Sequence, residues 1–143
     1  MAQVIKSVLV AHPALRMFEL VDAVEKYPEF LPWCGASECS YRDAGVTRAT
    51  LHINYRGIRQ SFSTENVKTP PTLMQIRLIE GPFKMLEGSW RFTDLAGQGC
   101  KVELSLRYEF SSRLLEKLIG PVFGFIANSM VDAFVKRAQT LYG

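Results

Sequence analysis

Histidines are the first side chains to test for catalysis, because their pKa lies near neutral pH, and this chain has two of them. His12 directly precedes Pro13 at the start of a predicted helix, where we expect it to cap the helix. His52 alternates with Leu51 and Ile53 and should therefore point outward from a strand. A general base needs a positioned partner in a sheltered site. Neither histidine predicts catalysis, and no serine hydrolase triad is visible.

Metal and cofactor motifs are also missing. Zinc takes three or four Cys, His or carboxylate ligands at short spacing, and no such cluster occurs. There is no G-x-x-x-x-G-K-[ST] loop, and Gly97-x-Gly99 is typical of a hairpin loop. We therefore expect no cofactor and no metal. The three cysteines, Cys34, Cys39 and Cys100, form neither a C-x-x-C pair nor an even disulfide set, which favours a reducing compartment, the cytoplasm.

Basic side chains could bind phosphate groups of a nucleic acid. Five of them are predicted to point outward from a sheet: Arg48, Arg77, Arg91, Lys101 and Arg107. Four glutamates of the predicted sheet dilute this set, namely Glu65, Glu87, Glu103 and Glu109. The net charge of +3 comes from 17 basic and 14 acidic residues, which marks out no DNA-binding groove. A solvated face is the favoured interpretation, and a surface for ribosomal RNA is the alternative.

The remaining candidate function is the binding of an apolar molecule. Aromatic, aliphatic and sulfur-containing side chains lie on elements that should face one another, and Phe125 belongs to the same aromatic set. The candidate ligand-binding residues are Phe30, Trp33, Tyr55, Phe62, Met74, Trp90, Leu104, Leu106, Tyr108, Phe123, Ile126, Met130 and Phe134. Such residues also build an ordinary core, so composition alone leaves both interpretations open.

Composition indicates a folded protein with a single domain, residues 1–143. The hydrophobic share is 48% and the charged share is 22%, unlike a disordered chain. The N-terminal apolar patch stops at His12 and is too short for a signal peptide. The longest uncharged run, Leu118 to Val131, falls short of the roughly 20 apolar residues that span a bilayer. We therefore expect this run to lie in the core.

The elements that position these side chains follow from periodicity. Residues 4–10 are rich in β-branched residues and predict a first strand. Apolar residues three and four apart predict a helix over residues 14–24, and residues 27–33 predict a short second helical turn. After Gly35 the period changes to two. Turn signals then separate six strands, at residues 43–45, 56–57, 69–71, 80–82 and 97–99.

Two of these strands alternate clearly between apolar and polar residues. They are Val46 to Tyr55 and Cys100 to Phe110. Short connections predict an antiparallel meander, with the first strand at its edge. From Ser112 the period is again helical, with Ser112 as a cap and a kink or break at Gly120-Pro121. The fold class is therefore α+β: a curved seven-stranded antiparallel sheet around a long C-terminal helix. A cavity tends to open between such layers.

Three segments resemble one known family. The run Val21 to Cys34 places three aromatic residues and two prolines at a helix exit. It is similar to the corresponding run of the coenzyme Q-binding and ribosome-association-toxin branch of the START-like (polyketide cyclase/dehydrase) superfamily. Gly81 to Phe92 and Ile126 to Ala138 carry the same resemblance. It therefore extends along the whole chain and implies a helix-grip fold.

The resemblance also implies a function. Relatives hold a polyprenylated quinone in a hydrophobic tunnel, so the expected activity is non-enzymatic binding of ubiquinone or a related lipid, in support of respiration or quinone biosynthesis. The flap of residues 27–33 should lie over one mouth of the cavity. Tyr108 is the expected polar contact to a quinone carbonyl, because a buried hydroxyl needs a partner. Any membrane contact would be transient.

Two other functions stay open. One bacterial branch of the family acts as a toxin that blocks association of the ribosomal subunits, which makes the large subunit a second candidate partner. A cyclase or dehydrase is suggested only by the superfamily name, and no acid/base pair is visible for the pocket. The absence of an Arg- and Ser-rich N-terminal extension favours a bacterial cytoplasmic protein.

Overall fold

Seven strands, two α-helices and one 3₁₀ helix make up the fold in a computed structural model that describes residues 1–143. The order is β1 (Ala2–Val10), α1 (Ala14–Asp22), the 3₁₀ helix η1 (Val24–Glu29), β2 (Cys34–Arg42), β3 (Val46–Tyr55), β4 (Ile58–Thr69), β5 (Leu73–Glu80), β6 (Phe83–Asp94), β7 (Cys100–Phe110) and α2 (Arg113–Tyr142). The predicted element order is therefore confirmed. The short helical turn begins earlier than predicted, at Val24, and it contains Pro28.

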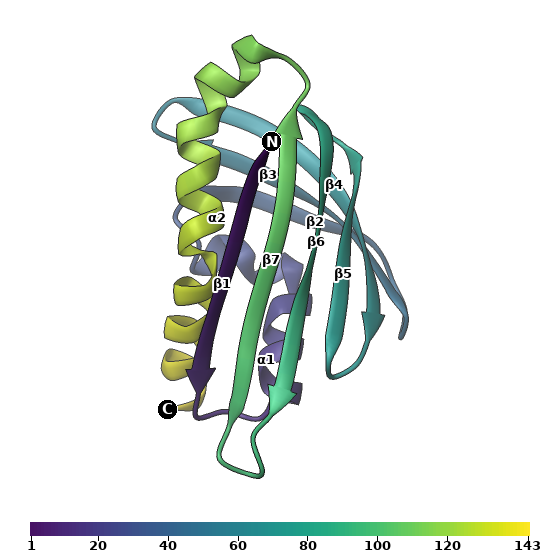
Figure 1. Cartoon of the computed structure of the whole chain (residues 1–143), viewed down its shortest axis with the longest axis vertical. Helices are drawn as coiled ribbons and strands as arrows, with labels where there is room; N and C mark the ends of the chain where they lie inside the picture. Colours follow the sequence, from purple (N-terminus) through teal and green to yellow (C-terminus); the bar gives the residue numbers. More distant parts are fainter.

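The strands form one antiparallel sheet in the order β1-β7-β6-β5-β4-β3-β2. The first strand pairs with the last along its whole length, from Ala2 opposite Tyr108 to Val10 opposite Cys100. Figure 1 shows that the sheet curves strongly. The strands β2, β3 and β4 cross behind α2, whereas β1 and β7 run alongside it. This arrangement is the predicted helix-grip architecture.

Strand irregularities produce the curvature. Register shifts interrupt the β2/β3, β4/β5 and β6/β7 pairings, and such bulges bend a strand and increase its twist. Gly88 of β6 lies where the twist brings two strands very close. A Cβ built on Gly88 would lie 2.1 Å from the carbonyl oxygen of Ser105 on β7. Only glycine allows that approach.

The long helix α2 lies on the concave face of the sheet. Its buried residues recur at spacings of three and four, namely Ile119, Phe123, Ile126, Ala127, Val131, Phe134 and Ala138. The Ser112 hydroxyl caps the helix as predicted, accepting a hydrogen bond from the Leu115 N–H at 3.1 Å. One cluster of 34 buried apolar residues joins the sheet, α1 and α2.

Of the predicted kink or break at Gly120-Pro121, the structure has the kink, because α2 is continuous from Arg113 to Tyr142. The ring of a proline inside a helix crowds the carbonyl four residues earlier and removes one hydrogen bond, whereas Gly120 has no Cβ that would clash with the ring. Figure 1 shows the first turns of α2 inclined to the rest, so the chain bends there without breaking. By length and composition alone α2 could cross a membrane. In this structure it contacts β7, β1 and α1 as a core helix.

Candidate functional site

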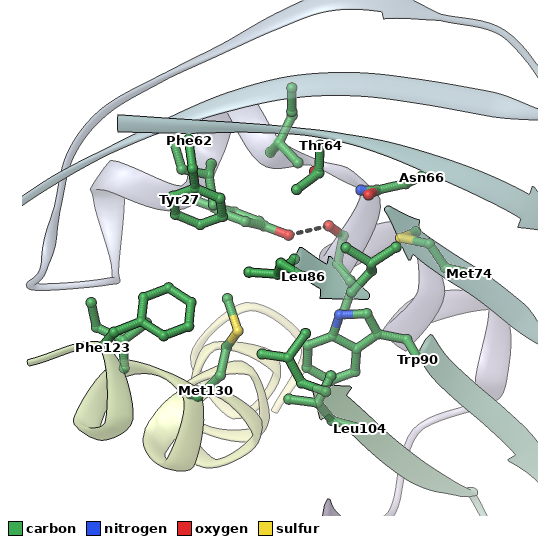
Figure 2. Close-up of a pocket in the computed structure, with 18 residues that line it drawn as sticks. Tyr27, Phe62, Thr64, Asn66, Met74, Leu86, Trp90, Leu104, Phe123 and Met130 are labelled. Atoms are coloured by element: carbon green, nitrogen blue, oxygen red, sulfur yellow. Dashed lines mark hydrogen bonds between the residues drawn. The ribbon is translucent and has the colours of Figure 1, made fainter. Parts of the chain in front are cut away.

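An apolar cavity lies between the concave face of the sheet and α2 (Figure 2). Sixteen of its 18 lining residues are hydrophobic, and the free space among them is about 60 Å³. The lining comes from α1, η1, five strands and α2: Val21, Val24, Tyr27, Ala49, Leu51, Phe62, Thr64, Asn66, Met74, Ile76, Leu86, Trp90, Leu104, Leu106, Phe123, Ile126, Ala127 and Met130. No charged side chain is among them.

Eight of the thirteen candidate residues line this cavity: Phe62, Met74, Trp90, Leu104, Leu106, Phe123, Ile126 and Met130. The other five do not line it, so the expected placement of Phe30, Trp33, Tyr55, Tyr108 and Phe134 is corrected. All thirteen project from the predicted elements. The position of the helices against the sheet decides which of these side chains reach the cavity. The periodicity of a strand or helix does not predict that position.

Two of these five belong to an aromatic cluster behind the cavity wall. The ring of Phe134 lies 5.4 Å from both Tyr27 and Trp90 and 5.3 Å from Phe30. Tyr27 lines the cavity, and its hydroxyl donates to the Val21 carbonyl. Trp33 is buried outside the lining, with 1% of its surface exposed. The flap therefore contributes one wall residue rather than covering a mouth with all its aromatic rings.

The predicted polar contact, Tyr108, is also outside the cavity. Its ring lies 4.8 Å from Phe123 and 6.1 Å from Phe83, and it is not among the lining residues. Burial raises the pKa of Tyr108 above its usual value. Tyr55 stacks on Phe125 with 5.6 Å between the ring centres. Phe125 is 47% exposed, so this pair lies at the surface and Phe125 is no part of the lining.

The two polar lining residues, Thr64 and Asn66, were not predicted. They lie on β4 in phase with Phe62, and the pairing of β3 with β4 places all three on the inner face. Continuing the period of two from Phe62 would have found them. The Asn66 Oδ1 atom is buried and has no hydrogen-bond partner. Figure 2 shows Thr64, Asn66 and the Tyr27 hydroxyl on one side of the cavity, with Phe123, Met130 and Leu104 opposite.

A buried ion pair lies next to this polar side. The Lys68 ammonium is 3.1 Å from Asp22 Oδ2, and the Thr47 hydroxyl donates to Asp22 Oδ1 at 2.7 Å. The Arg42 guanidinium is 3.6 Å from the same carboxylate. Both carboxylate oxygens of Asp22 therefore already have partners. Opposite charges neutralise each other here, so the cavity itself stays electrically neutral.

The outward basic residues are mostly paired with glutamates. Arg48 and Arg77 both bind Glu65, and these two guanidinium groups hold the pKa of its carboxyl below the usual value. Arg107 lies 3.5 Å from Glu87 and Lys101 lies 2.9 Å from Glu103. Arg91 makes no ion pair. Four of the five predicted basic residues are therefore neutralised by ion pairs.

The two histidines lie apart from the cavity. His52 points outward as predicted, with Nε2 2.6 Å from the Glu38 carboxylate. His12 is no helix cap, since the N-cap of α1 is Pro13 and the Ala14 N–H at the start of the helix donates to Asp94 Oδ1 at 2.8 Å. The His12 ring packs on the edge of Tyr142 at 5.7 Å. No group of three His, Cys, Asp or Glu side chains is close enough to hold a metal ion.

Relatives match this chain over 90% or more of its length. The chain is 41% identical to the ribosome association toxin RatA of Pseudomonas aeruginosa, over 96% of both chains. It is 42% identical to RatA of Vibrio cholerae, over 100% of this chain and 99% of the relative. It is 33% identical to the mitochondrial coenzyme Q-binding protein COQ10 homolog B of Xenopus laevis, over 90% of this chain and 54% of the relative.

Solved structures at lower identity support the fold alone. A Thermus thermophilus protein matches 99% of this chain and 100% of its own with a TM-score of 0.83 and 19% identity. A Streptomyces aromatase/cyclase gives 0.79 and 18%, over 96% and 93% of the two chains. A START superfamily protein from Mycobacterium smegmatis gives 0.77 and 19%, over 97% and 98%.

A family model described as "Polyketide cyclase / dehydrase and lipid transport" matches residues 10–135. The close relatives have names of toxins or coenzyme Q-binding proteins, whereas enzyme names occur among the distant structural neighbours. The chain belongs to this START-like family, in the branch of the ribosome association toxins and coenzyme Q-binding proteins.

Proposed function

We propose that this protein is a cytoplasmic, non-enzymatic carrier that binds a polyprenyl quinone between the sheet and α2. The observation that carries the proposal is the cavity between the sheet and α2, whose lining is hydrophobic at 16 of 18 positions. Each CH₂ group buried there stabilises the complex by about 0.8 kcal/mol. The printed name of the Xenopus laevis relative supports a quinone as the ligand.

The lining also supports binding without chemical conversion. It contains no His, Cys, Asp, Glu, Lys or Arg, so no acid/base pair or nucleophile faces the ligand. The Tyr27 hydroxyl is already bonded to a backbone carbonyl. Burial raises the pKa of this hydroxyl further above neutral pH, so it stays protonated.

A quinone requires this cavity to widen. The free space of about 60 Å³ is well below the roughly 300 to 1,000 Å³ of typical ligand sites. Met74 and Met130 are flexible side chains that adapt to a new neighbour. The ligand would displace them and move α2 and η1 outward.

Quinone content after purification tests the proposal. Wild-type protein from a ubiquinone-producing host should carry ubiquinone, detected by mass spectrometry of an organic extract. Ile126→Trp fills the cavity and should lower the content at least tenfold, with overpacking strain of about 1 to 3 kcal/mol. Leu118→Trp is the matched control, because Leu118 lies on the exposed side of α2. Absence of quinone from wild type, with no rise in melting temperature on adding decylubiquinone, would contradict the proposal.

A second candidate function is inhibition of ribosomal subunit joining. The observation that favours it is the 41–42% identity over nearly the full length to proteins named ribosome association toxin. Binding to RNA phosphates would depend on unpaired positive charge. Arg91, which is exposed and makes no ion pair, is the strongest candidate on the convex face.

Sucrose-gradient sedimentation tests this second function. Excess protein added to bacterial ribosomes should shift associated particles to free subunits, less so at higher salt. Arg91→Glu should reduce the shift, and Lys84→Glu on the same strand serves as the matched control. An unchanged profile with wild type would remove this candidate. Because Ile126→Trp leaves the convex face intact, it should retain ribosome activity even where quinone binding is lost.

A further inference from the structure

Asn66 is the lining residue with an unsatisfied polar group. Its side chain is 93% buried, since 7% of its surface is exposed, and its Oδ1 atom has no hydrogen-bond partner. Buried polar atoms are nearly always paired in native proteins, and an unpaired one lowers stability. Figure 2 shows the carboxamide directed toward the cavity, on the same side as Thr64. An asparagine in this position therefore has a role that packing does not explain.

The surrounding structure leaves Asn66 free to bind a ligand. It lies on β4 between Thr47 of β3 and Ile76 of β5. The Thr47 hydroxyl already donates to Asp22, and the other Asp22 oxygen is occupied by Lys68. The nearest polar network is thus complete without Asn66. The side chain points instead into the cavity, which Thr64 also lines.

We propose that Asn66, assisted by Thr64, binds the head group of the ligand, and that this head group is a neutral ring bearing a hydroxyl. The inference rests on the proposed function and specifies the chemical form of its ligand. A phenol or quinol hydroxyl donates to Asn66 Oδ1 and can accept a hydrogen bond in return. A quinone carbonyl can accept a hydrogen bond from Asn66 Nδ2 but has no hydrogen to donate, so it leaves Oδ1 unpaired. The cavity should therefore prefer the reduced, hydroxyl-bearing form.

The charge of the ligand follows from the same lining. No cationic or anionic side chain faces the cavity, and the charges of Asp22 and Lys68 neutralise each other beside it. A charged head group would lose its hydration without gaining a counter-ion. Fatty acids and phospholipid head groups are thus excluded at this end. A neutral phenolic head group would contact the polar side of the cavity, and an apolar body would contact the hydrophobic side.

Two probe compounds test the proposal, because only one of them has a hydroxyl that can donate a hydrogen bond. The two compounds are 4-decylphenol and its methyl ether, 4-decylanisole, with binding followed by Trp90 fluorescence and by calorimetry. Wild type should bind the phenol at least tenfold more tightly, because a site that bonds a hydroxyl rejects the analogue without it. In Asn66→Leu the two affinities should come within twofold of each other. Met74→Leu, a lining change of similar volume without a polar group, should keep the preference.

Ligand-free stability gives a second measurement. Asn66→Leu removes an unpaired polar atom and should melt at a higher temperature than wild type. Equal binding of both probes by wild type would overturn this inference and leave the proposed function standing, and Asn66 Oδ1 would then be satisfied by water alone. Failure of wild type to bind either probe would overturn the proposed function and this inference together.

Discussion

Some buried polar side chains of this protein have a hydrogen-bond or ion-pair partner, and others have none. Lys68 is the clearest example of the first kind, because only 4% of its side chain is exposed and its ammonium is bound to Asp22. Removing one member of a buried pair leaves a charge in a poorly solvated place. Asp22→Ala should therefore destabilise the fold by about 3 to 5 kcal/mol. Urea unfolding measures this, and a loss below 1 kcal/mol would contradict the assigned pair. Glu25→Ala, at an exposed ion pair with Arg42, is the control and should cost under about 1 kcal/mol.

The buried thiols predict how stability changes with pH. Burial raises the pKa of Cys34 and of Cys100 from 9.0 to about 11. The unfolded chain therefore loses these protons first, and stability should fall as pH rises from 9 to 11. At pH 10.5 the expected loss is about 2 kcal/mol per thiol. The double variant Cys34→Ala/Cys100→Ala should show a flatter urea midpoint over this range, and an identical pH profile would contradict the prediction.

The polar residues Tyr108 and Asn66 could not be placed correctly from the sequence. Alternation along β7 correctly places Leu104 and Leu106 inside. Tyr108 is in phase with both of them, yet it lies beyond the lining, because the cavity ends before the strand does. Asn66 was missed for a different reason. It is in phase with Phe62 on β4 and therefore lies on the inner face, but its polar side chain did not suggest a lining residue.

Among the elements, β6 depends most on a single residue. A Cβ on Gly88 would meet backbone atoms of Ser105 and Leu106 at 2.1 and 2.9 Å, and no side-chain rotation relieves such a clash. Gly88→Ala should therefore separate β6 from β7 and destabilise the fold by about 2 to 4 kcal/mol. Gly45→Ala is the matched control, since the nearest atom to its Cβ would be 3.8 Å away. Equal melting temperatures for the two variants would show that the strands can move apart without cost.

Element types could be predicted more reliably than their ends. Buried residues recur every second position in a strand and every three or four positions in a helix. This local pattern predicts the seven strands and the two α-helices. The start of η1 depends on Tyr27, whose buried hydroxyl binds the Val21 carbonyl and draws the chain into a tight turn. The continuity of α2 through Pro121 depends on Ile119 and Phe123 packing on both sides of it. Both are tertiary effects that a short sequence window does not contain.

In the molecule as a whole, one contact joins the end of η1 to the C-terminal half of α2 beside the cavity. Arg137 of α2 binds Glu29 of η1 at 2.7 Å, and its guanidinium lies 4.9 Å above the Phe30 ring. Tyr27, on the same 3₁₀ helix, is part of the cavity wall. A ligand that widens the cavity should therefore separate η1 from α2 and break this contact first.

Arg137→Met should consequently speed ligand exchange. Methionine keeps a flexible apolar stem against Phe30 and loses both the ion pair and the cation–π contact, which are worth about 0.5 to 1 kcal/mol each at partly exposed sites. The dissociation rate of 4-decylphenol should rise about three- to tenfold in stopped-flow fluorescence. Lys136→Met, one position away and exposed, should leave the rate unchanged. If both variants released the probe at the wild-type rate, the ligand would leave by a route that does not separate η1 from α2, and the site of opening would have to lie elsewhere along the sheet.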